Sequence, residues 1–109
     1  MILLVLACAT RAPFCLQPAA SRLLTVEVHA GASCQLEAKV DFIEVRKGPN
    51  GPIVWTATSK KPLALERITY GVAPEGFEAS PAESLSPGDP ITFDVKGVGV
   101  RGGLTLTAP

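Results

Sequence analysis

Most of the patterned segments in this sequence alternate between apolar and polar residues with a period of two. The alternation is strict at residues 24–28 (Leu-Thr-Val-Glu-Val) and 91–95 (Ile-Thr-Phe-Asp-Val), and it returns at residues 104–107. This period is typical of β-strands with one buried face, and we find no segment with the period of a helix. The pattern therefore predicts an all-β protein.

The longest strand-like run, residues 35–46, changes phase within its length. Apolar side chains occupy even-numbered positions as far as Phe42, and from Ile43 they occupy odd-numbered positions. A slip of one residue would turn all later side chains to the wrong face, so we predict a kink or β-bulge at Phe42–Ile43. A second strand candidate, residues 63–70, shows the same kind of phase change near Glu66–Arg67.

Glycine and proline occur ten times each in the 109 residues and divide the chain into short segments. Residues 47–52 (Lys-Gly-Pro-Asn-Gly-Pro) predict a turn, and the alternation at 53–57 predicts that a hairpin strand follows it. Residues 71–90 contain four prolines and predict a loop with a short edge strand around Phe77. The resulting six to seven short strands favour a small two-sheet β-sandwich of immunoglobulin- or fibronectin-like character, with a small barrel as the alternative.

The first nine residues, Met-Ile-Leu-Leu-Val-Leu-Ala-Cys-Ala, form an uncharged apolar run. The run is too short to span a bilayer, which takes about 20 residues, and it does not alternate like a strand with one buried face. A secretory signal peptide fits better, although no positively charged residue precedes the run. An ordinary cleaved signal and a buried apolar start stay open as alternatives to the more specific interpretation that follows.

The segment Val5-Leu6-Ala7-Cys8 resembles the lipobox of bacterial lipoproteins, in which a cysteine after small residues becomes the lipidated first residue. The resemblance implies that residues 1–7 are the remnant of a signal peptide and that Cys8 carries a lipid anchor. Several acyl chains are needed for lasting attachment, because one chain alone binds a membrane only marginally. Residues 8–22 would then be the lipidated cysteine and a flexible tether, and residues 23–109 would be the sandwich domain.

Three cysteines occur in the chain, which leaves one to be explained if two form a disulfide. With Cys8 lipidated, Cys15 and Cys34 remain, and an oxidising periplasm would allow them to pair. The bridge would close a loop of about 20 residues and contribute about 3 kcal/mol to stability. Two unpaired cysteines are the alternative, since the sequence does not show the distance between their Cα atoms.

Ten basic and ten acidic side chains cancel, so the chain has no overall field that would attract nucleic acid. His29 is the only histidine, and any Ser-His or Cys-His mechanism would have to use it. It falls on the polar face of its predicted strand, and no metal-ligand spacing surrounds it. The carboxylates of Glu37 and Asp41 fall on a solvent-facing side and indicate surface charge rather than a paired acid and base. We therefore expect no catalytic residues, no metal site and no cofactor.

Two further features have both a structural and a functional interpretation. Residues 97–102 match G-x-G-x-x-G, but no helix follows them, so we expect a hairpin turn rather than a dinucleotide site. Five acids and no base occur from Glu75 to Asp94, whereas basic residues cluster near two turns, at residues 46–47 and 60–61. Such charges could orient a partner, but ordinary solvated surface is the more common explanation.

Residues 68–77 (Ile-Thr-Tyr-Gly-Val-Ala-Pro-Glu-Gly-Phe) and 85–95 (Leu-Ser-Pro-Gly-Asp-Pro-Ile-Thr-Phe-Asp-Val) carry a further resemblance. They are similar to a pattern in short uncharacterised exported proteins and lipoproteins of Gram-negative bacteria, and the similarity runs from about Val40 to the end. That family has no assigned activity, so the resemblance implies a compartment and a β fold and transfers no functional residue. Tyr70 and Phe77 either pin the loop between them or form an exposed aromatic interaction patch.

We expect a lipid-anchored domain on the periplasmic side of the cell envelope, without enzymatic activity, that binds another envelope protein or has a structural role. Its contact with the membrane would be the lipid on Cys8. One alternative is a periplasmic module that binds a small ligand or a metal ion in a pocket with convergent polar groups. Another is an enzyme that places His29 beside a nucleophile or a carboxylate in a cleft.

Overall fold

A computed structural model describes residues 13–109, and the regular elements in this part of the chain are all β-strands. They are β1 (Cys15–Pro18), β2 (Thr25–His29), β3 (Ala38–Arg46), β4 (Ile53–Leu65), β5 (Arg67–Thr69), β6 (Glu78–Ala79), β7 (Pro90–Gly97) and β8 (Val100–Thr107). The predicted signal-peptide remnant and the predicted lipidation residue Cys8 lie outside the described residues.

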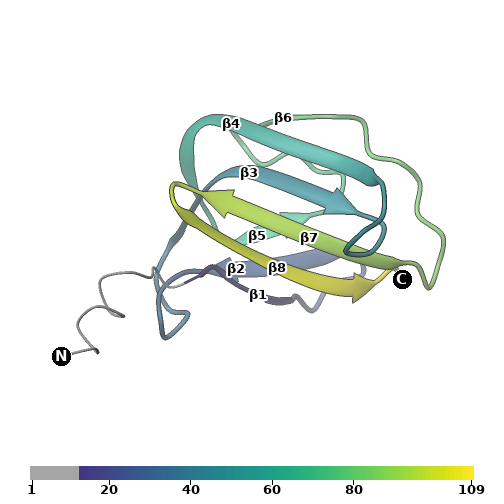
Figure 1. The fold of residues 1–109 in the computed structure, drawn as a ribbon, viewed down its shortest axis with the longest axis horizontal. Helices are drawn as coiled ribbons and strands as arrows, with labels where there is room; N and C mark the ends of the chain where they lie inside the picture. The colour runs from purple at the N-terminus through teal and green to yellow at the C-terminus, as the bar shows by residue number, and fades with distance from the viewer. Residues whose placement is uncertain (1–12) are drawn as a thin grey trace.

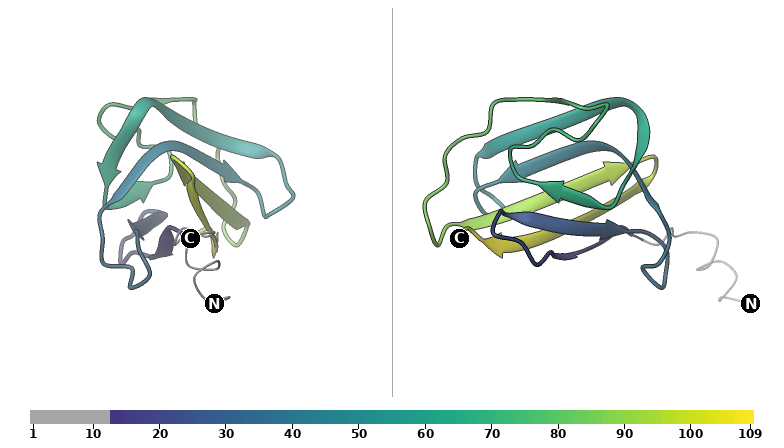
Figure 2. Two further views of the ribbon diagram at one scale, coloured as in Figure 1. Left: turned by 60° about the vertical axis from the view of Figure 1, so that its left-hand side comes forward. Right: turned by 180° about the vertical axis from the view of Figure 1, so that it is seen from behind.

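The strands form two antiparallel sheets that lie against each other (Figure 1). The smaller sheet has the strand order β1-β2-β5, and the larger has the order β6-β4-β3-β7-β8. The left view of Figure 2 shows β1 and β2, in purple, below strands β3 and β4 of the larger sheet. The prediction of an all-β, two-sheet sandwich is confirmed.

Side chains from alternating strand positions fill the space between the sheets. Strand β2 contributes Val26 and Val28, and strand β7 contributes Phe93 and Val95, all of them at most 1% exposed. Trp55 on β4 is the largest of the fully buried side chains. Burial of each such side chain contributes about 1.5–3 kcal/mol, so the same alternation that predicts the strands also supplies much of their stability.

The register of β3 shifts between Val40 and Phe42, which places an irregularity at Asp41. Buried positions change parity across it, from Val40 on one side to Ile43 on the other. The predicted change of phase is confirmed, with the bulge one residue before the expected step at Phe42–Ile43. It keeps apolar side chains on the core face along the whole strand.

Strand β4 carries the larger part of this irregularity. Leu63 pairs with β3 on one side of the bulge and Thr58 pairs with it on the other, so residues 59–62 have no partners in the ladder. The hydroxyl of Ser59 donates to the carbonyl of Lys61 at 2.7 Å and closes this segment on itself. The two apolar segments on either side therefore belong to one long strand, although the interruption made them look like two in the sequence.

The chain passes from the larger sheet to the smaller one at Glu66. Strand β4 ends at Leu65, and β5 begins at Arg67 in the other sheet. The amide of Val28 donates to the carbonyl of Glu66 at 2.9 Å and fixes the crossing. The change of phase expected near Glu66–Arg67 is confirmed, since β4 and β5 belong to different sheets. Two facing sheets present their apolar side chains in opposite directions, so the apolar positions must change parity where the chain crosses.

Strand β1 is the main departure from the sequence analysis, which expected six to seven strands and a flexible tether as far as residue 22. Eight strands are present in the described part of the chain, and β1 pairs with β2 from Cys15 opposite His29 to Pro18 opposite Val26. The four residues of β1 end in a proline and are too few to show a periodic pattern. Their strand conformation depends on pairing with β2 and not on their own sequence. The very short β6 corresponds to the edge strand expected around Phe77.

Candidate functional site

A disulfide joins Cys15 to Cys34, with 5.7 Å between their Cα atoms. The predicted pairing is therefore confirmed, and the alternative of two unpaired cysteines is excluded. The bridge connects the start of β1 to the loop after β2, where Ala30 and Leu36 exchange two backbone hydrogen bonds. Cys34 has a positive φ of 58°, a left-handed conformation that non-glycine residues adopt rarely.

The surroundings of His29 are simple. Its Nε2 atom lies 4.0 Å from a carboxylate oxygen of Glu27, and its side chain is 35% exposed. The same carboxylate accepts from Gln17 at 3.1 Å and pairs with Arg67 at 3.4 Å. In residues 13–109, no three His, Cys, Asp or Glu side chains are grouped closely enough to hold a metal ion.

Tyr70 fastens the loop after β6 to the larger sheet. Its hydroxyl donates to the carbonyl of Glu83 at 2.6 Å, and the carbonyl of Val54 lies at 3.3 Å. The ring packs edge-on against Trp55, with 5.8 Å between the ring centroids. Burial of the phenol and the nearby Glu83 carboxylate raise the pKa of Tyr70 above its usual value of 10.0. The polar end of this side chain is therefore occupied within the protein.

Phe77 belongs to the core, with only 8% of its side chain exposed. Gly71 and Gly76, which flank the loop between the two aromatic rings, both have positive φ angles, 81° and 86°. Tyr70 and Phe77 thus hold this loop in place, as one of the two interpretations expected. An exposed patch made of both rings does not match the burial of Phe77.

The glycines of the G-x-G-x-x-G match serve a hairpin and close packing between strands. Strand β7 ends at Gly97 and β8 begins three residues later, with Gly99 at a φ of 71° between them. A Cβ atom on Gly102 would overlap the carbonyl oxygen of Phe14, just before β1. These glycines let backbones approach each other, and the segment continues as a strand.

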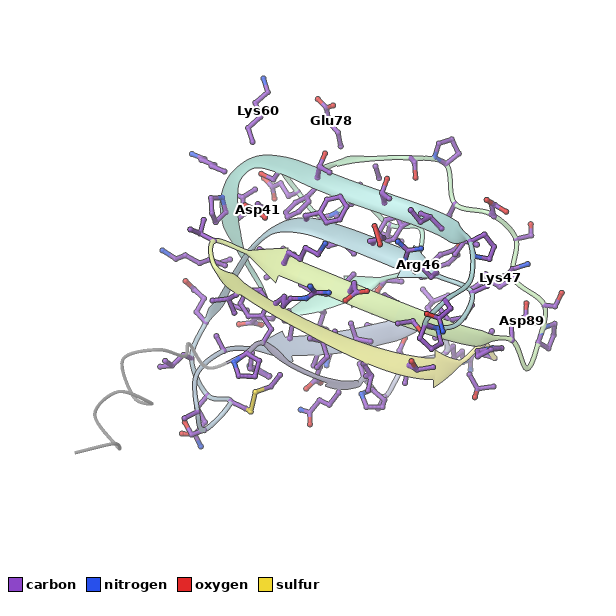
Figure 3. The ribbon with its side chains drawn as sticks, viewed as in Figure 1. Asp41, Arg46, Lys47, Lys60, Glu78 and Asp89 are labelled. Carbon is purple, nitrogen blue, oxygen red and sulfur yellow. A yellow bond between two sulfur atoms is a disulfide. The ribbon has the colours of Figure 1, made fainter. Side chains whose placement is uncertain are left out.

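Charges of both signs lie together at two places on the sandwich. Figure 3 shows Lys60 and Glu78 above β4 at the top of the view, and Lys47 and Asp89 together at the right. Lys60 and Glu78 line a surface pocket of about 560 Å³ beside β4. Arg46 pairs with Glu44 at 2.7 Å. The surface therefore carries mixed charge rather than an acidic region facing a basic one.

The two edges of the larger sheet differ. Beside β4, strand β6 adds two residues, and beyond it the amides of Ser80 and Glu83 donate to the carbonyls of Thr56 and Val54. Beside β8, the amide of Phe14 donates to the carbonyl of Arg101 at 3.2 Å, and no other backbone bond reaches this edge from the described residues. The sequence analysis did not place β8 at the edge of a sheet, because nothing local marks a strand as the last one in a sheet.

Among the described residues, no helix is long and apolar enough to cross a membrane. Comparisons with known protein families, with curated proteins and with solved structures find no match to this chain.

Proposed function

We propose that this chain is a non-enzymatic binding domain of the cell envelope, oxidised on the periplasmic side and held at a membrane by a lipidated Cys8. The observation that carries the proposal is the Cys15–Cys34 disulfide. Structural disulfides persist in oxidising compartments and are rare in the reducing cytosol. The disulfide therefore supports export, and the lipobox-like segment before Cys8 supplies a way of retaining the exported domain.

The start of β1 limits how far the domain can lie from its anchor. Six residues lead from Cys8 to Phe14, which is hydrogen-bonded to Arg101 just before β1. An extended chain rises at most about 3.5 Å per residue, so the tether reaches at most about 21 Å. The tether is shorter than the segment 8–22 expected from the sequence, because Cys15–Pro18 is part of the sheet. The domain would then work close to the membrane surface, where its partners are other envelope components.

His29 lies beside the carboxylate of Glu27, which is one of the two neighbours that the enzyme alternative expected. Its neighbour Glu27 is shared with two other side chains, and in the described part of the chain no serine hydroxyl or thiol is hydrogen-bonded to the imidazole. A nucleophile within hydrogen-bond reach of a base is the usual signature of covalent catalysis.

The pocket beside β4 supports a second candidate function, binding of a small ligand. Its volume of about 560 Å³ is within the range of ligand sites. Its polar lining, however, is mostly exposed. Ser59 is half-buried, and the exposed members are Thr58, Lys60, Lys61 and Glu78. Because ligand sites bury most of their ligand, this exposed pocket supports small-ligand binding only weakly.

The test is to produce the full chain in a Gram-negative bacterium in parallel with the variant Cys8→Ser. If the proposal is right, the parent chain takes up radiolabelled fatty acid and sediments with membranes, whereas Cys8→Ser does neither and is released with the periplasmic contents. A parent chain that stays in the cytosol, or one that sediments equally with and without Cys8, contradicts the proposal. Cys15→Ser is the matched control, since it removes a cysteine that is not proposed to carry lipid.

A further inference from the structure

One end of the sandwich brings together segments that are distant in the sequence. The β7–β8 hairpin turns there at Val98 and Gly99, and the loop between β2 and β3 lies beside it. Figure 1 shows both at the left, on the side where β1 starts, and the right view of Figure 2 shows them together from behind. We call this the N-proximal end, because the amide of Phe14, just before β1, is bonded to Arg101 there.

The N-proximal end carries an open hollow of about 500 Å³ whose lining is mainly apolar. The apolar residues of the lining are Phe14, Ala30, Pro62, Val98 and Val100. Among them, Phe14 is buried, whereas the side chain of Val98 is 66% exposed. The hollow therefore continues from the core out to an apolar side chain at the tip of the hairpin.

Leu36 extends this apolar surface. Its side chain is 62% exposed, and its backbone exchanges two hydrogen bonds with Ala30, which lines the hollow. The Cys15–Cys34 bridge ties the same loop to β1. Single exposed apolar side chains are normal on a protein surface, but a contiguous set of them marks an interaction surface. Leu36, Val98 and the hollow form such a set.

Exposed large apolar side chains also occur at the opposite end of the sandwich, at Leu23, Ile53 and Val72. Leu23 lines a small pocket there together with Leu106 and Pro109. Exposure alone therefore does not select one end, and the position of the anchor has to decide between them.

The length of chain between Cys8 and Phe14 makes that selection. This tether spans at most about 21 Å, and it enters the domain at the N-proximal end. The opposite end lies about 24 Å further along β8, from Val100 to Thr107, at about 3.4 Å per residue. The tether is therefore too short for the domain to stand on its opposite end. The N-proximal end, in contrast, lies next to the anchor in every upright arrangement.

The charges at the N-proximal end define what kind of contact it makes. Lys39 and Lys61 are exposed there, and so are Glu37 and Glu66. Two cations and two anions give no net attraction for anionic lipids, so an apolar contact is expected. Such a contact should change little with salt, because screening acts on charges and not on apolar burial.

We propose that the N-proximal end rests on the surface of the membrane that holds the anchor, with Leu36 and Val98 inserted among the lipid headgroups. Two aliphatic side chains bind a bilayer weakly from solution, but a short tether raises the effective concentration of the surface to about the millimolar range. The opposite end, with Leu23 and Val72, would then face the periplasm and be presented to other envelope components. The inference rests on the proposed function, because it gives the anchored domain its orientation.

The experiment attaches the full chain to a bilayer through Cys8, which the Cys15–Cys34 bridge leaves as the one free thiol. A phosphatidylcholine nanodisc contains a maleimide lipid that reacts with this thiol and a second lipid that carries a nitroxide at its headgroup. One chain is coupled to each disc, and methyl signals are followed by NMR. Because the two ends are about 24 Å apart, Leu36 and Val98 should be broadened at least about threefold more than Leu23 and Val72.

Val98→Asp tests the contact itself, since a carboxylate is costly to remove from water. It should reduce the broadening of Leu36 by at least about twofold. Val72→Asp is the matched control, because Val72 is 55% exposed at the opposite end, and it should leave the broadening of Leu36 unchanged. Thermal unfolding checks that both variants are folded. If Val98→Asp does not fold, Leu36→Asp, read at the methyl groups of Val98, provides the same comparison.

Several results would overturn the inference. They are equal broadening at both ends, broadening confined to Leu23 and Val72, no broadening at either end, and broadening of Leu36 that is the same in Val98→Asp as in the parent. Broadening that appears only with two chains on a disc would also overturn it and would assign the surface to a second copy. The maleimide replaces cellular lipidation, so failure of this contact and failure of the anchor are distinguishable.

Discussion

Replacing both Cys15 and Cys34 by serine should lower the free energy of unfolding by about 3 kcal/mol. The two cysteines are 19 positions apart, and a closed loop of about 20 residues restricts the unfolded chain by about 11 cal/mol/K in the chain-entropy relation. The native fold should survive, because β1 keeps its four pairs with β2 and its contact with β8. The loss is a large fraction of the 5–15 kcal/mol typical of a domain, roughly a fifth to three fifths.

Equilibrium unfolding in urea, followed by the fluorescence of the buried Trp55, measures this loss. With a slope of about 1.5–2 kcal/mol/M, the midpoint should fall by about 1.5–2 M. The parent protein in reductant should unfold at nearly the same midpoint as the double variant. A loss below about 1 kcal/mol, or a reduced parent as stable as the oxidised one, would refute the reasoning.

The backbone at Cys34 provides a matched control for the same experiment. Its φ of 58° is a conformation that asparagine adopts more readily than serine. The variant Cys15→Ser/Cys34→Asn should therefore be more stable than the double serine variant, by up to about 1 kcal/mol. Equal stability of the two variants would show that the loop relaxes once the bridge is removed.

Two further predictions concern the packing around the loop and the hairpin. Tyr70→Phe should cost about 1 kcal/mol at neutral pH, because the bond to the Glu83 carbonyl is lost. Because the pKa of Tyr70 is higher in the folded than in the unfolded chain, its contribution to stability is complete below pH 10.0 and falls as pH rises through the folded-state pKa. The urea midpoints of the parent and of Tyr70→Phe should therefore converge in alkaline solution. A constant difference between the two midpoints would contradict this prediction. Gly102→Ala should destabilise by about 1–3 kcal/mol, because its Cβ would overlap the Phe14 carbonyl, whereas the neighbouring Gly103→Ala should change stability by less than about 1 kcal/mol. Thermal melts that show the same loss for both glycine variants would contradict this.

The parts of the fold that were predicted from the sequence are those with a local signal. The change of parity within β3 located the irregularity to within one residue, because a bulge is visible as a slip in the order of apolar residues. The change of phase near Glu66–Arg67 was visible for the same reason, and only the structure shows that the chain crosses between the sheets there. The Cys15–Cys34 pair followed from the count of cysteines together with the lipobox resemblance at Cys8, and the structure confirms the pair.

The parts that were missed depend on contacts between distant segments. Strand β1 exists because residues 15–18 pair with β2 and are tied to Cys34, and neither fact is encoded in their own sequence. The burial of Phe77 decided between two interpretations that the sequence left open. The position of β8 at the edge of its sheet is a property of strand order. The alternating Leu-Thr-Leu-Thr at its end therefore predicted a strand but not its position in the sheet.

The central claim is that an exported, oxidised domain is anchored through Cys8, and the intact mass of the protein purified from bacterial membranes tests it most directly. The account predicts a chain that begins at Cys8, carries the added mass of acyl groups, and is lighter by two hydrogens than the same chain after reduction. An unmodified chain that still begins at Met1, with all three cysteines as free thiols, would contradict it.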